Sequence, residues 1–175
     1  MGTLHGGCSV PDANINQGSL RWFWLAFAIV VSDQGSKILA EHLLVIHEPV
    51  AVLPSFNLYL TYNLGAAFSF LSQAGGWQRW LFALLSTGVS VFIVLWLRRI
   101  PRDQKSLACA LALVLGGAIG NLIDRLFRAG GGVVDFVDIY YGTWHWPAFN
   151  VADSAISIGA VILLWSAIRV TEKSA

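Results

Sequence analysis

Long apolar stretches dominate the chain, and four of them are long enough to cross a membrane. A helix needs roughly 20 consecutive apolar residues to span a hydrocarbon core of about 30 Å. The stretches cover about residues 22–43, 77–97, 107–127 and 147–170. The pattern predicts an all-α polytopic membrane protein, a four-transmembrane-helix bundle in one domain over residues 21–175. The polar, glycine-rich residues 1–20 are predicted to be a flexible leader without a role in the fold.

Three of the four stretches carry two polar residues one helical turn apart. Side chains at this spacing share one face of a helix. Ionisable groups are costly in hydrocarbon, so they are rarely kept there without a partner or a function. The pairs are Asp33 and Lys37, Asn121 and Asp124, and Asn150 and Asp153. They indicate a polar site inside an otherwise apolar bundle.

The basic residues predict how the helices are oriented in the membrane. Seven of the eleven Lys and Arg residues fall at one side of the predicted bundle: Arg21, Arg98, Arg99, Arg102, Lys105, Arg169 and Lys173. The positive-inside rule assigns that side to the cytoplasm. Both termini are then cytoplasmic, and two longer segments, about 44–76 and 128–146, lie outside.

Helix rise allows the depth of each polar pair to be compared. At about 1.5 Å per residue, Lys37, Asn121 and Asp153 each lie about 24 Å from the basic residue at the inner end of their helix. The agreement predicts one polar cluster near the outer surface, built by three helices.

Small residues predict that the helices pack closely. Gly116 and Gly120 are four residues apart, as are Ala155 and Gly159. Such small-xxx-small pairs allow close approach of membrane helices. On their own they are more typical of plain packing than of a site, but close packing would bring Asp124 near Asp153.

The two outer segments carry patterns that differ from simple linkers. Residues 50–62 alternate in part between apolar and polar positions, interrupted by a proline, which favours short strands or a hairpin. Residues 63–70 are apolar enough to lie on the membrane. Residues 133–141 are predicted to be extended. Asp135 in that stretch is equally compatible with a solvated strand position and with membership of the polar cluster.

Composition excludes several chemistries before it favours one. The net charge of +1 argues against a nucleic-acid partner, and the two cysteines are too few and too distant for a disulfide framework or a metal motif. No set of His, Cys and Glu has metal-binding spacing, and no phosphate loop or dinucleotide fingerprint is present, so no metal or cofactor is expected. Ser36 and Lys37 could suggest a serine hydrolase, but adjacent helical residues point about 100° apart.

Carboxylates remain as the chemically useful groups. Two carboxylates held close together tend to share one proton, and such a pair can hydrolyse a peptide bond by general acid–base catalysis. The purely structural alternative pairs Asp33 with Lys37 and Asp124 with Arg125 or Arg128, and uses Asp153 as a helix cap. That alternative leaves a surplus of acids over cations. The five acids are Asp33, Asp124, Asp135, Asp138 and Asp153.

Five sequence blocks resemble the lipoprotein signal peptidases, also called signal peptidase II. In chain order they are Asp-Gln-Gly-Ser-Lys at 33–37, Asn-Leu-Gly-Ala-Ala-Phe-Ser at 63–69, Gly-Asn-Leu-Ile-Asp-Arg at 120–125, Val-Val-Asp-Phe at 133–136 and Phe-Asn-Val-Ala-Asp-Ser at 149–154. One block would be weak, but all five in the family's order, on a four-span topology, are highly specific. They cover the chain from the first span to the fourth.

The resemblance implies a bacterial inner-membrane aspartic endopeptidase with its active site near the periplasmic face. It would cleave signal peptides from diacylglyceryl-modified prolipoproteins just before the lipidated cysteine, with water as nucleophile. By motif position the catalytic pair is Asp135 and Asp153. The outer segments would form a small extracytoplasmic β-type cradle and a lid.

The resemblance also implies roles for the other polar residues. Those expected to line the substrate site are Asn63, Asn121, Arg125 and Asn150. Those expected to support it are Asp33, Lys37 and Asp124. The partners would be lipid-modified precursors and membrane lipids, and a monomer would suffice because one chain carries the whole site.

Two other functional classes stay open on the residues alone. A small proton- or ion-coupled transporter would also keep acids within the membrane, but it predicts acids at many depths, discontinuous helices and internal repeats. A noncatalytic assembly factor would use the polar pairs only to tie helices together.

Overall fold

Four long helices form the body of the protein in the computed structural model, which describes residues 20–65 and 75–174. The helices are α1 (Leu20–Leu43), α2 (Gln78–Leu97), α3 (Lys105–Phe127) and α4 (Val151–Ser174). Each is long and apolar enough to cross a membrane. This confirms the predicted four-span bundle. Residues 1–19 of the predicted leader over residues 1–20, and most of the block at 63–69, lie outside the described residues, whereas Leu20 begins α1.

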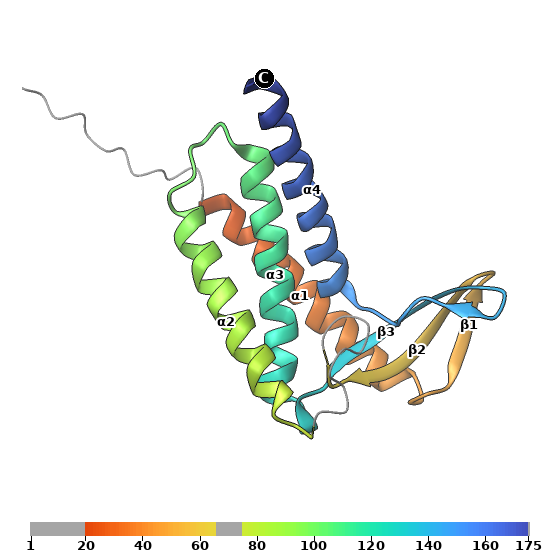
Figure 1. Ribbon diagram of the computed structural model, residues 1–175. Helices are drawn as coiled ribbons and strands as arrows, with labels where there is room; N and C mark the ends of the chain where they lie inside the picture. Colours follow the sequence, from red (N-terminus) through yellow and green to blue (C-terminus); the bar gives the residue numbers. More distant parts are fainter. Residues whose placement is uncertain (1–19, 66–74, 175) are drawn as a thin grey trace, which may run out of the picture.

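Helix α3 is the centre of the bundle and packs against each of the other three helices (Figure 1). In its most apolar part, 56% of the residues are buried, against 17–22% in the other three. The exposed side chains of the outer helices are large and apolar, as expected for surfaces that face lipid: examples are Leu84 and Phe92 on α2.

The predicted close packing is confirmed, and glycines of α3 and α4 lie at two different helix interfaces. A Cβ at Gly116 would lie 2.7 Å from the Ile29 Cβ on α1. A Cβ at Gly159 on α4 would lie 2.7 Å from the Ala110 carbonyl oxygen on α3. Both approaches are shorter than a side chain permits, so glycine at these positions sets the spacing between helices.

A small antiparallel sheet lies at one end of the bundle, in the order β1-β2-β3-β4 (Figure 1). The strands are β1 (Pro49–Leu53), β2 (Phe56–Asn63), β3 (Val133–Tyr141) and β4 (Trp144–His145). The first two form the hairpin that was predicted, and β3 is the predicted extended stretch. The start of α1, the α2–α3 connection and the end of α4 lie at the opposite end of the bundle.

Helix α4 begins four residues later than its apolar run predicts. Phe149 pairs with β3 instead, because its backbone N–H donates to the Val137 carbonyl (3.1 Å) and its carbonyl accepts from the Val137 N–H (2.9 Å). Asn150 then caps the helix, since its side-chain oxygen accepts from the Asp153 N–H at 2.9 Å. The cap is Asn150 rather than Asp153, which leaves the Asp153 carboxylate available for other contacts.

Candidate active site

A buried ionic cluster joins α1 to α3 at the sheet end of the bundle. The Lys37 ammonium lies 2.8 Å from Asp33 and 2.7 Å from Asp124, and it donates to the Asn121 side-chain oxygen at 3.0 Å. Lys37, Asp33 and Asp124 are fully buried. One cation between two carboxylates, with an amide as third acceptor, satisfies all three ammonium protons. The two predicted polar pairs of α1 and α3 therefore form a single unit.

This cluster also holds the two segments that carry the candidate catalytic acids. The Asp33 carboxylate accepts from the Ala152 N–H at 2.9 Å, next to Asp153. The Asp124 carboxylate accepts from the Val134 N–H at 3.2 Å, next to Asp135. Each supporting acid thus fixes the backbone beside one candidate catalytic acid.

Two asparagines connect the candidate acids to each other. Asn121 donates to Asp153 at 2.8 Å, and Asn150 donates to Asp135 at 2.7 Å. Asn150 also lies 3.3 Å from the Asn121 side-chain oxygen. A continuous chain of hydrogen bonds therefore runs from Asp135 through both amides to Asp153.

The two candidate acids differ in their surroundings. Asp135 on β3 is 2% exposed, whereas Asp153 on the first turn of α4 is half-buried. Burial, and then the charge of Asp153, raise the pKa of Asp135 to about 7, against the opposing hydrogen bonds from Asn150 and Asn63. Asp135 therefore belongs to the polar cluster and is not a solvated strand residue.

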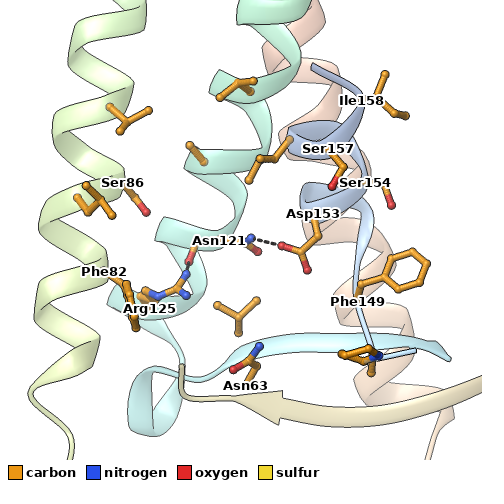
Figure 2. Close-up of a pocket in the computed structure, with 18 of the residues that line it drawn as sticks. Asn63, Phe82, Ser86, Asn121, Arg125, Phe149, Asp153, Ser154, Ser157 and Ile158 are labelled. Carbon is orange, nitrogen blue, oxygen red and sulfur yellow. Dashed lines mark hydrogen bonds between the residues drawn. The ribbon is translucent and has the colours of Figure 1, made fainter. Parts of the chain in front are cut away.

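Two cavities meet at the candidate acids. The larger, about 700 Å³, lies between α2, α3 and α4 and contains Asp153, Asn121 and Arg125 (Figure 2). The smaller, about 380 Å³, lies against the sheet and contains Asp135. Both are lined by Asn63 at the end of β2, together with Pro147 and Ala148. Each candidate acid therefore lines one of two neighbouring cavities.

Arg125 points into the larger cavity from the last turn of α3 (Figure 2). Its guanidinium donates to the Gly65 carbonyl at 2.9 Å and lies 5.3 Å from the centre of the Phe82 ring on α2. These contacts fix a cation on the wall of an otherwise largely apolar cavity. Polar groups so placed fix the orientation of a ligand and provide specificity.

The structure corrects one expected contact and rejects one rival site. Close packing does not pair Asp124 directly with Asp153: Asp124 turns toward α1 and bonds Lys37 and Arg128, while Asn121 reaches Asp153. Ser36 donates to the Asp33 backbone carbonyl rather than to Lys37. The ion pairs Asp33–Lys37 and Asp124–Arg128 of the structural alternative are both present. The acids that tie the helices together therefore also belong to the candidate site.

Sequence reasoning missed two residues that hold the parts of the site together. Gln34 on α1 donates to the Asp124 carboxylate and to the Gly120 carbonyl, each at 3.0 Å. Arg79 on α2 donates to the Arg125 and Leu126 carbonyls at the end of α3. Gln34 follows Asp33 in the block at 33–37, and a polar residue at this place in an apolar run could have indicated a buried hydrogen-bonding role. Nothing local marked Arg79, because its partners are distant backbone carbonyls.

The supporting and candidate acids bond amide side chains, cations and backbone N–H groups, and they are not arranged around a common point as metal ligands would be. Within residues 20–65 and 75–174, no set of three or more His, Cys, Asp or Glu side chains could hold a metal ion.

Comparison with known proteins places this arrangement in a family. The family model described as signal peptidase (SPase) II matches residues 25–169. The chain belongs to the signal peptidase II family. It is therefore a multi-pass membrane peptidase by family, as the five sequence blocks predicted.

Relatives and solved structures agree with membership of the signal peptidase II family. The chain is 49% identical to the lipoprotein signal peptidase of Teredinibacter turnerae, over 86% of this chain and 88% of that protein. It is 51% identical to that of Pseudomonas syringae pv. tomato, over 88% and 91%. A bacterial membrane enzyme solved at 2.3 Å by the in meso method matches with a TM-score of 0.79 at 26% identity, over 89% of this chain and 92% of that chain. A second, solved at 1.9 Å, matches with a TM-score of 0.71 at 27% identity, over 83% and 91%.

Proposed function

We propose that the protein removes signal peptides from diacylglyceryl-modified prolipoproteins, with Asp135 and Asp153 as the catalytic pair. The observation that carries the proposal is the meeting of two acids at the junction of two cavities, with the pKa of Asp135 raised to about 7 by burial and by Asp153. An acid with that pKa can hold a proton at neutral pH while its neighbour is ionised. Such a pair titrates as a unit.

The chemistry uses water and one shared proton. The ionised carboxylate removes a proton from water as the water oxygen attacks the scissile carbonyl carbon, and the protonated carboxyl gives its proton to the carbonyl oxygen. The tetrahedral intermediate then collapses as the carboxyl that took the water proton donates it to the leaving nitrogen and the C–N bond breaks. The other, now ionised, carboxylate takes back a hydroxyl proton as the new carboxyl terminus forms, and the amine of the lipid-bearing cysteine leaves. Asn121 and Asn150 hold the two carboxylates in place throughout, at 2.8 Å and 2.7 Å.

The surrounding residues suit a substrate held in the membrane. Arg125 and Asn63 line the larger cavity and can bind carbonyl groups of the peptide next to the cut. A signal helix and acyl chains can lie among the helices in lipid, so the scissile bond would arrive at the sheet end of the bundle. We place that end at the periplasmic face of a bacterial inner membrane, with both termini cytoplasmic, because the basic residues gather at the other end.

The arrangement of acids favours this peptidase over a transporter. The acids Asp33, Asp124, Asp135 and Asp153 gather at the sheet end, and the four spans are continuous helices. A coupled transporter would instead place its acids on interrupted helices near the midplane.

The decisive experiment is cleavage of a lipidated precursor by single variants of the pair. Asp135→Asn and Asp153→Asn are each expected to lose about 10²–10⁴-fold in kcat, because one acid–base group is removed while its size is kept. Asp138→Asn is the matched control on the same strand: this buried acid bonds Asn57 and His145 away from the pair, and normal cleavage is expected. Thermal unfolding confirms that each variant is folded. Folded variants of either Asp135 or Asp153 that cleave at the normal rate would refute the assignment.

A further inference from the structure

Three side chains from distant parts of the chain meet beside the active site, and one of them, Tyr62, also lines the smaller cavity. They are Glu41 near the end of α1, Tyr62 on β2 and Arg128 directly after α3. Arg128 Nη1 donates to one Glu41 carboxylate oxygen, and the Tyr62 hydroxyl donates to the other at 3.0 Å. The Arg128 and Glu41 side chains are only 16% and 25% exposed. We call this group of three the outer clamp.

The outer clamp contacts the site through one residue pair of the β2–β3 ladder, which we call the rung. Arg128 Nε donates to the Asp124 carboxylate at 2.9 Å, and Asp124 accepts from the Val134 N–H. Val134 pairs directly with Tyr62 in the β2–β3 ladder. The next residues on the two strands are Asn63 and Asp135. One rung is therefore held from both strands, immediately beside a cavity-lining residue and a candidate catalytic acid.

The chemistry of the outer clamp requires an arginine. The planar guanidinium directs Nε to Asp124 and Nη1 to Glu41, a geometry that a lysine ammonium on a flexible stem does not reproduce. Burial alone would lower the pKa of Arg128, but the bonds and charges of Asp124 and Glu41 outweigh it and raise the pKa. Burial and Glu41 likewise raise the pKa of Tyr62, so its hydroxyl stays protonated as a donor.

We propose that Glu41, Tyr62 and Arg128 act as positioning residues that fix the β2–β3 rung on the bundle and thereby set the place of Asp135 relative to Asp153. The inference rests on the proposed function, because the positioned acids matter for cleavage only if they are the catalytic pair. The three side chains act through the strands and hold Asp135 at a fixed place.

The test combines kinetics of lipidated-precursor cleavage with hydrogen exchange of the strands. The clamp variants are Glu41→Gln, Tyr62→Phe and Arg128→Lys. Each is expected to lower kcat about tenfold, because small displacements of catalytic groups are costly, while KM changes less than about twofold. Backbone amides of 56–63 and 133–141 should exchange faster, with those of α3 unchanged. The double variant of Glu41 and Arg128 should be no worse than the poorer single variant, since both act in one unit.

Matched controls carry the same substitutions on exposed residues: Glu48→Gln, Tyr141→Phe and Arg99→Lys. They are expected to leave kcat and exchange unchanged. The proposal fails if the clamp variants keep normal kcat and normal exchange. It also fails if kcat falls without faster exchange in the two strands. Exchange that rises equally in α3 would indicate a general loss of stability and would likewise contradict the proposal. Failure of the proposed function is distinguishable: the wild-type enzyme would then not cleave the precursor, while exchange measured in an Asp135→Asn background would still show whether the clamp holds the rung.

Discussion

At the scale of single residues, the raised pKa of Asp135 has a consequence for stability. The pKa is about 7 in the folded protein, against an ordinary value of 3.8. Between those two pH values the unfolded chain has lost the proton that the folded chain keeps, so folding binds a proton. The contribution of Asp135 to the free energy of unfolding is therefore fully present below about pH 4 and is lost as pH rises through 7.

Asp135→Asn should consequently be more stable than the wild type at pH 8 and similar to it at pH 4. The asparagine oxygen can still accept from Asn150, and no buried charge develops as pH rises. The gain at pH 8 is at most a few kcal/mol, from about three pH units at about 1.4 kcal/mol each. Thermal unfolding in detergent across this pH range measures it. Asp103→Asn, at an exposed acid of the α2–α3 connection, is the control and should leave the pH dependence unchanged. A wild type and Asp135→Asn variant with parallel pH dependence would contradict the prediction.

Residue spacing predicted some contacts among the polar residues and not others. The helical spacing of Asp33 and Lys37 correctly predicted a direct ion pair, since both lie on one helix. The direction of Asp124 could not be predicted in this way, because it depends on how α3 is rotated against α1 and α4. Asp135 was equally undecided, since its burial depends on the pairing of β3 with a strand some seventy residues away.

At the scale of elements, the face of α3 that meets α1 and α4 fixes the support of the site. A Cβ at Gly120 would lie 2.5 Å from the Asp33 carboxylate oxygen and 3.4 Å from the Ala152 Cβ. Gly120→Ala should therefore displace Asp33, weaken its bond to the Ala152 N–H and disturb Asp153. We expect a loss of about 1–3 kcal/mol in the free energy of unfolding, typical of overpacking, together with lower kcat.

Gly88 on α2 offers a matched control for that substitution. A Cβ there would meet nothing within 4 Å. Gly88→Ala should leave cleavage unchanged and stabilise the helix by up to about 1 kcal/mol, because alanine loses less backbone entropy than glycine. Thermal unfolding and precursor cleavage are measured for both variants. Equal behaviour of the two alanine variants would show that the close approach at Gly120 is not required.

The boundaries of the elements show where local pattern stops being sufficient. Apolar length and the small residues predicted four packed helices, because burial in lipid demands continuous apolar runs with satisfied backbone. The start of α4 differed from the prediction because Phe149 pairs with Val137 on β3. That pairing is a long-range contact, and the apolar run of 147–150 gives no sign of it.

At the scale of the whole molecule, the candidate site lies beside a cavity between three of the helices. The larger cavity lies among α2, α3 and α4, and its walls are mostly apolar apart from the site residues. On the proposed function, a precursor whose signal helix and acyl chains remain in lipid would reach the acids between these helices. Depth estimates from helix rise correctly predicted that the polar pairs of three helices lie together, because continuous helices have the same rise per residue.

The same arrangement predicts that the lipid on the substrate matters for cleavage. Two acyl chains keep the cysteine at the membrane surface and add apolar contact, which raises the local concentration of the scissile bond beside Asp135 and Asp153. One precursor prepared with and without its diacylglyceryl group should therefore differ by at least about tenfold in kcat/KM, equivalent to about 1.4 kcal/mol of binding in the transition state. Cleavage is followed in detergent micelles and in vesicles. Asp153→Asn enzyme serves as the blank for both substrates, so that contaminating proteases are excluded. Equal rates for the two precursors would leave a membrane signal peptidase with no preference for lipoproteins, and the proposed substrate class would be wrong.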